Sequence, residues 1–181
     1  MRNAALLLVG VFLIILQGNL SPVIATINSW GAEFGIRAST PSLVLPLVVF
    51  LAVHEASMVR GAVLAFVLGH ALGLASSAPP WLFTFVTMVT WWLARVAGVR
   101  FAAQTFLTQM TLAFAFSVVE SLIVLVLLAI FGADSFRPVE ISAVVFPRAA
   151  ATALCAPLVF GLAERLRYGS LSGRSAGELS I

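Results

Sequence analysis

The sequence contains little charge, no lysine and a single cysteine. Charged residues make up 9% of its 181 residues, whereas hydrophobic residues make up 61%. A soluble domain of this length could not cover so much apolar surface with so few charges, which argues against a cytosolic or secreted globular protein. All ten basic residues are arginines scattered along the chain, so nucleic acid is not an expected partner. Cys155 stands alone, which excludes an internal disulfide and a cysteine-rich metal site.

Long, continuous apolar runs dominate the rest of the sequence, without the alternation of a transmembrane β-barrel. At roughly 20 apolar residues per span, they predict an all-α integral membrane protein, a six-transmembrane-helix bundle over residues 1–168. The expected spans are about 4–26, 41–54, 61–77, 81–97, 103–131 and 142–163. Residues 169–181 form a Gly- and Ser-rich tail that we expect to be disordered in the cytoplasm.

The arginines predict the orientation, because six spans place both termini on one side of the membrane. If both termini are cytoplasmic, the cytoplasmic segments contain more arginines than the outer segments do. The positive-inside rule favours this arrangement. Arg148, early in the last span, is counted as an outer residue whose side chain can extend toward the membrane surface. The inner group is Arg2, Arg60, Arg95, Arg100, Arg165, Arg167 and Arg174, and the outer group is Arg37, Arg137 and Arg148.

Glu120 is the charged residue that stands clearly inside a predicted span. It follows Gln109, Ala113 and Ser117 at intervals that place all four residues on one helix face. An ionisable group within a membrane is costly, so this face must contact protein or water. Two interpretations stay open: a proton or ligand site, and a packing seam where Glu120 hydrogen-bonds to a neighbouring helix. The seam is favoured because no second carboxylate lies near Glu120 in the sequence.

Small residues recur every four positions in the third predicted span, at Gly61, Ala65, Gly69 and Gly73. Such a ridge lets another helix approach closely, either from this chain or from a partner, and packing within the chain is favoured. Pro157 should kink the last span, which can open a groove for a partner. The ridge and the region of Pro157 are therefore the candidate sites for packing a partner's helix.

The sequence offers little support for an enzyme. It has no HExxH and no Gly-rich phosphate loop ahead of a basic residue, and its GxSxG match, GRSAG (173–177), lies in the Gly- and Ser-rich tail and not between a strand and a helix. His54 and Glu55 are expected in a solvated turn, and His70 has no other metal-ligating residue nearby. We therefore expect no enzymatic activity, no cofactor and no bound metal.

The order of several segments resembles the rod-shape-determining MreD family. The resemblance is carried by TPSLVLPLVVF (40–50), where a proline opens the second helix, and by GAVLAFVLG (61–69) after a short polar turn. Residues 147–166, with Pro157 and a basic end, are similar to the last span of that family. The segment SVVE, ending at Glu120, is similar to one in which family members can carry an acidic residue. Gly73 departs from the family, which has an aspartate at this place.

The resemblance implies a non-enzymatic scaffold of the bacterial cell-elongation (rod) complex in the cytoplasmic membrane, with a bundle similar to the substrate-binding components of energy-coupling-factor transporters. It would support cell-shape control and lateral peptidoglycan synthesis. The implied partner is MreC, a single-span coiled-coil protein, and through it MreB, a RodA-type glycosyltransferase and a class B penicillin-binding protein.

Two alternatives remain. The first is a small-solute, vitamin-like binding subunit of an energy-coupling-factor type transporter, which would use Gln109, Glu120, His70 and tryptophans around a cavity. The second is a membrane protein that shares with the MreD family only a Leu-, Val- and Ala-rich composition.

Overall fold

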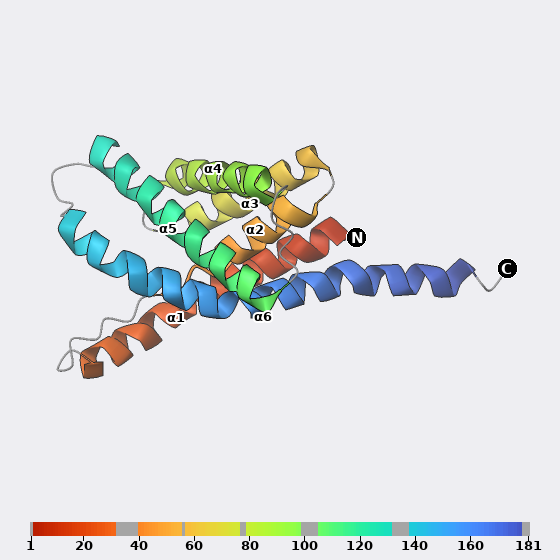
Figure 1. Ribbon diagram of the computed structural model, residues 1–181, viewed down its shortest axis with the longest axis horizontal. Coiled ribbons are helices and arrows are strands. Elements are labelled where there is room, and N and C mark those ends of the chain that lie inside the picture. The colour runs from red at the N-terminus through yellow and green to blue at the C-terminus, as the bar shows by residue number, and fades with distance from the viewer. Residues whose placement is uncertain are drawn as a thin grey trace.

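The computed structural model describes residues 2–31, 40–55, 57–76, 79–98, 105–131 and 138–178. Within these residues the chain forms α-helices and no strand, which confirms the all-α prediction. The six helices are α1 (Arg2–Gly31), α2 (Val44–His54), α3 (Met58–Leu74), α4 (Pro80–Gly98), α5 (Phe106–Phe131) and α6 (Pro138–Glu178). In Figure 1, α1 begins and α6 ends at the same end of the bundle.

The short helix α2 lies in the middle of the bundle and packs against all the other helices (Figure 1). All its residues from 44 to 52 are buried. Its 11 residues rise about 16 Å, roughly half the thickness of a hydrocarbon core. A helix that is apolar on all sides is stable when protein surrounds it completely, and this explains the continuous apolar run from residue 43 to residue 53.

Three helices are long and apolar enough to cross a membrane: α1 over Ala4–Ile24, α5 over its full length, and α6 over Val145–Leu166. Large apolar side chains are exposed on the outside of these helices, including Leu8 on α1, Val126 on α5 and Leu158 on α6. Many exposed apolar side chains on one molecule are compatible with a membrane protein, because water would disfavour such a surface.

One described helix corresponds to each of the six predicted spans, but three of the six are shorter than a membrane span needs, and several ends differ from the prediction. α3 begins at Met58, because the Ser57 hydroxyl accepts a hydrogen bond from the Arg60 N–H and caps the helix. Residues 169–178 were expected to be disordered and instead continue α6. Isolated glycines at 169 and 173 lower helix propensity by about 1 kcal/mol each relative to alanine, which does not by itself end a helix.

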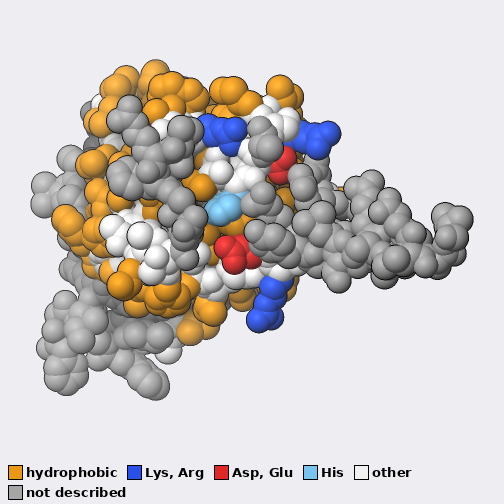
Figure 2. Space-filling view, turned by 45° about the vertical axis from the view of Figure 1, so that its right-hand side comes forward, with side chains coloured by type: hydrophobic (Ala, Val, Ile, Leu, Met, Phe, Trp, Pro, Cys, Tyr) orange, Lys and Arg blue, Asp and Glu red, His pale blue; other side chains and the backbone are white. Residues whose placement is uncertain are grey.

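Charged side chains gather at one end of the bundle. The rings of Phe50 and Phe160 meet edge-on at 5.7 Å, so this part of α6 lies beside the C-terminal half of α2. Glu164, one turn after Phe160, therefore lies at the same end as His54 and Glu55. Figure 2 shows acidic, basic and histidine side chains together on the face at this end. Of the arginines used for the orientation, Arg37, Arg100 and Arg137 lie outside the described residues.

Candidate functional site

The start of α2 is held by polar side chains from α1 and α6. The Leu43 N–H donates to Oε1 of Gln17 at 2.9 Å, and the Ser42 N–H donates to Oγ1 of Thr152 at 2.9 Å. Backbone N–H groups at the start of a helix have no partner within it, and leaving them unpaired in an apolar interior is costly. Gln17 and Thr152 therefore supply the hydrogen-bond acceptors that the backbone of α2 cannot provide for these N–H groups.

The end of α2 is held by Arg95 of α4. Its guanidinium Nη1 donates to the carbonyl oxygen of Ala52 at 2.9 Å and also to the carbonyl oxygen of Glu55. A cation suits this position because the unpaired carbonyls at a helix C-terminus carry partial negative charge. Glu55 is buried, so the prediction of a solvated turn was wrong: the turn is drawn into the bundle by Arg95.

The polar face predicted on α5 is turned into the bundle. Ala113 and Ser117 are completely buried, Glu120 is 5% exposed and Gln109 is half-buried. Polar residues within an apolar helix face other helices because hydrocarbon cannot satisfy their hydrogen bonds.

Arg148 of α6 is the charged neighbour of Glu120. One guanidinium nitrogen, Nη2, lies 4.0 Å from Oε2 of Glu120, and the Arg148 side chain is 29% exposed. The sequence allows the Arg148 side chain to extend toward the membrane surface, whereas in the structure its guanidinium lies beside Glu120. The reason is electrostatic, because the buried carboxylate attracts the guanidinium inward.

Glu120 and Arg148 belong to a group of polar side chains that we call the Glu120 cluster. Its members come from the segment before α2, from α4, from α5 and from α6, so the cluster joins four parts of the chain. It consists of Ser42, Thr90, Ser117, Glu120, Arg148 and Thr152, and all except Arg148 are buried. A cavity of only about 10 Å³ borders Glu120, so the cluster has no room for a ligand larger than water.

The small-residue ridge of α3 faces α4. A Cβ atom on Gly69 would lie 2.8 Å from Cβ of Thr87, and one on Gly61 would lie 3.1 Å from the Trp91 ring. Ala65 and Gly73 are buried as well. The ridge is therefore used for packing within the chain, and a partner helix would have to bind elsewhere. Pro157 lies half-buried within α6, and the helix continues through it.

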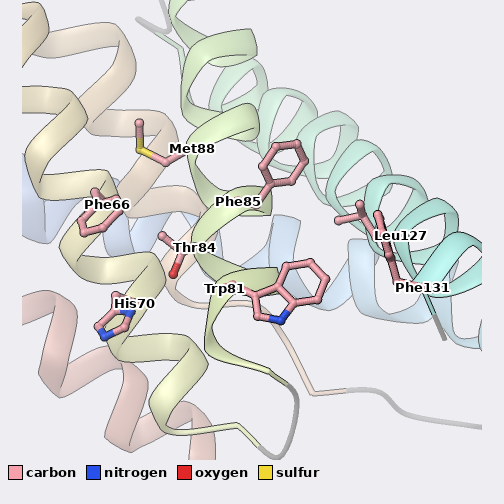
Figure 3. Close-up of a pocket in the computed structure, with 8 residues that line it drawn as sticks. All are labelled: Phe66, His70, Trp81, Thr84, Phe85, Met88, Leu127 and Phe131. Carbon is pink, nitrogen blue, oxygen red and sulfur yellow. The ribbon is translucent and has the colours of Figure 1, made fainter. Parts of the chain in front are cut away.

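An apolar groove of about 900 Å³ opens between α3, α4 and α5 (Figure 3). The Trp81 and Phe131 rings meet edge-on at 5.8 Å across it, and the Phe66 and His70 rings lie parallel at 6.3 Å. His70 thus belongs to this outer groove and does not share a cavity with Glu120. The groove is lined by Phe66, His70, Trp81, Thr84, Phe85, Met88, Leu127 and Phe131.

The chain matches no protein-family model, no curated protein and no solved structure. Within the described residues, no group of three or more His, Cys, Asp or Glu side chains could hold a metal ion. The functional interpretation therefore depends on the geometry of the Glu120 cluster and the groove, together with the family resemblance of the sequence.

Several residues of the site were missed in the sequence. Gln17, Thr90 and Thr152 are isolated polar residues within apolar runs, and Arg95 was interpreted only as a boundary charge. A usable signal was present, because Arg148 and Thr152 are four residues apart and so share one face of a helix. Polar residues inside apolar spans usually contact one another, which would have grouped this pair with Glu120.

Proposed function

We propose that this chain is a multi-pass protein of the bacterial cytoplasmic membrane that acts as a non-enzymatic scaffold of the rod complex, as its resemblance to the MreD family implies. The observation that supports this most is the contrast between two spaces. The polar interior around Glu120 is closed, whereas a large apolar groove is open on the outside of α3, α4 and α5. This contrast favours binding through the outer helix surfaces over binding beside Glu120.

The proposed orientation places both termini in the cytoplasm. In support, α3 begins and α4 ends at the end of the bundle where α1 begins and α6 ends (Figure 1), and these two helix ends contain Arg60 and Arg95. Cationic residues concentrate on the cytoplasmic side of membrane proteins. The Glu120 cluster, at the opposite end of α2, would then lie nearer the outer side.

The proposed occupant of the groove is the anchor helix of an MreC-type partner, the single-span coiled-coil protein that the family resemblance implies. Phe66, Trp81 and Phe85 are each 51% exposed, so half of each ring remains available for contact. Aromatic side chains that fill pockets supply much of the energy of protein interfaces. MreB and the peptidoglycan synthases would be reached through this partner.

A solute-binding subunit of an energy-coupling-factor type transporter is less well supported. Sites for small molecules usually have a volume of about 300 Å³ or more and combine apolar walls with a few polar groups. The space beside Glu120 has about 10 Å³. Glu120 and the larger space, whose polar residues include His70 and Thr84, are thus in different parts of the molecule, and the set of Gln109, Glu120 and His70 does not surround one cavity.

Co-purification with an MreC-type protein from the same cells tests the proposal. Phe85→Ser removes an exposed ring from the groove, and we expect it to reduce recovery of the partner about tenfold, equivalent to roughly 1.4 kcal/mol. Leu158→Ser is the matched control, because Leu158 is an exposed apolar residue of α6 that does not line the groove. Equal recovery with both variants would contradict the groove as the docking site.

Native mass spectrometry of the gently purified protein separates the two functions. A stoichiometric coiled-coil membrane protein supports the scaffold. A bound small molecule without such a partner contradicts it and supports the solute-binding subunit.

A further inference from the structure

Buried polar atoms without a hydrogen-bond partner converge on Glu120. Within the described side chains they include Thr90 Oγ1, Trp91 Nε1, Ser117 Oγ, Glu120 Oε2 and Arg148 Nε. All except the indole nitrogen of Trp91 belong to the Glu120 cluster. Native proteins rarely leave such atoms unpaired, so a concentration of them in one place indicates a bound polar group.

Two of the residues that carry these atoms line the same small cavity. Thr90 is 1% exposed and Glu120 is 5% exposed, and both line the space of about 10 Å³, together with Thr87. The remaining walls are aliphatic side chains of α2 and α3. A cavity of roughly 10–15 Å³ holds one water molecule, provided that two or more polar partners are present. Glu120, Thr90 and Thr87 meet that requirement.

We infer that this cavity binds one water molecule, which bridges Glu120 of α5 and Thr90 of α4. The water donates one hydrogen to Oε2 of Glu120, and the Thr90 hydroxyl donates to the water oxygen. The second hydrogen of the water is directed to the Thr87 hydroxyl oxygen. These bonds satisfy both unpaired atoms, and they link two helices that make most of their contacts elsewhere, α4 with α3 and α5 with α6.

A water molecule fits this site better than a cation does. Arg148 brings a positive charge to within 4.0 Å of the same carboxylate oxygen, so the charge of Glu120 is already balanced. Metal cations such as Ca²⁺ need about six or more oxygen ligands, whereas most of the cavity wall is aliphatic. The volume of the cavity and the charge balance of the Arg148–Glu120 pair therefore favour a neutral, dipolar ligand with one heavy atom.

The variant Thr90→Val tests the inference through the direction of its effect. If the water is bound, valine removes one of its partners and leaves the Glu120 oxygen less well satisfied, so Tm falls by about 2–6 °C. If no water is bound, valine replaces an unpaired buried hydroxyl with a methyl group, and Tm stays the same or rises. Thr111→Val is the control, because Thr111 is exposed and donates only to Leu107 of its own helix at 2.9 Å.

The same substitution in a Glu120→Leu background completes the test. We expect the fall in Tm caused by Thr90→Val to disappear there, since the second partner of the water is gone. An undiminished fall in that background overturns the inference. In an experimental structure at a resolution that shows ordered water, a peak within hydrogen-bonding distance of Thr90 Oγ1 and Glu120 Oε2 supports it, and continuous aliphatic contact without such a peak overturns it.

Discussion

The Thr152 hydroxyl lies 2.9 Å from the backbone nitrogen of Ser42, a residue 110 positions earlier in the chain. It accepts the hydrogen bond of that N–H group and donates its own hydrogen to the carbonyl oxygen of Arg148 at 2.8 Å. One side chain of α6 thus accepts the hydrogen bond of a backbone N–H group at the start of α2. The stability of the central helix therefore depends on residues far away in the sequence.

Thr152→Val should destabilise the bundle. The substitution keeps the shape of the side chain but leaves the buried Ser42 N–H without an acceptor, which costs about 1–3 kcal/mol. Thermal unfolding in mild detergent, followed by tryptophan fluorescence, measures the change. Thr152→Ser retains the hydroxyl and should keep most of the stability. If the valine and serine variants unfold at the same temperature, the hydrogen bond has no energetic role.

Arg148→Met should cost more than the removal of both charges together. Alone, it leaves the Glu120 carboxylate buried without a counter-charge, and breaking a buried pair in this way costs about 3–5 kcal/mol, or somewhat less here because Arg148 is partly exposed. Adding Glu120→Leu removes the remaining charge and should recover most of the loss. The four proteins of this double-mutant cycle are compared by thermal unfolding. Additive losses would show that the two side chains do not interact.

Gly69→Ala should weaken the contact between α3 and α4. The new Cβ would lie 2.8 Å from Cβ of Thr87 and 3.1 Å from the backbone oxygen of Phe83, so one of the helices must shift. Overpacking of this kind costs about 1–3 kcal/mol. Gly161→Ala is the matched control, since a Cβ atom there meets nothing within 4 Å. We expect the control to be neutral or to stabilise by up to about 1 kcal/mol, and equal Tm changes would contradict the packing of the ridge on α4.

Arg95→Met should loosen the C-terminal end of α2. It removes the charged donor to the carbonyl oxygens of Ala52 and Glu55, and hydrogen bonds to charged groups contribute about 1.5–3 kcal/mol. Arg95→Lys keeps the charge but loses the forked geometry, so its effect should be intermediate. Hydrogen exchange of the α2 backbone amides in detergent gives a local measurement. Protection unchanged in the methionine variant would argue against this role of Arg95.

The sequence predicted the helices well because each one is an apolar run limited by local signals. Ser57 before α3 and Pro79-Pro80 before α4 interrupt the apolar pattern within a few residues of the observed helix ends. The inward direction of Ser117 and Glu120 was also predictable, since their spacing alone places them on one face of α5.

The polar contacts of α2 could not be predicted in the same way. Gln17 and Leu43 are 26 positions apart, and Arg95 and Ala52 are 43 positions apart. Such pairs depend on how the helices are arranged around α2, and no periodicity within a single run contains that information. The contact of Arg148 with Glu120 was not predicted for the same reason, because the two residues lie on different helices.

The burial of α2 by the other helices has a consequence for the order of events during synthesis. This helix is synthesised before α6, yet the Ser42 N–H at its start is paired by Thr152 of α6. Until α6 has been synthesised, the start of α2 therefore lacks its hydrogen-bond acceptor, and α2 is exposed to lipid, chaperones or the insertion machinery. Chains stopped after residue 131 should leave α2 sensitive to proteases in isolated membranes, and full-length chains should protect it. The packing around α2 is complete only after α6 has been synthesised and has packed against it.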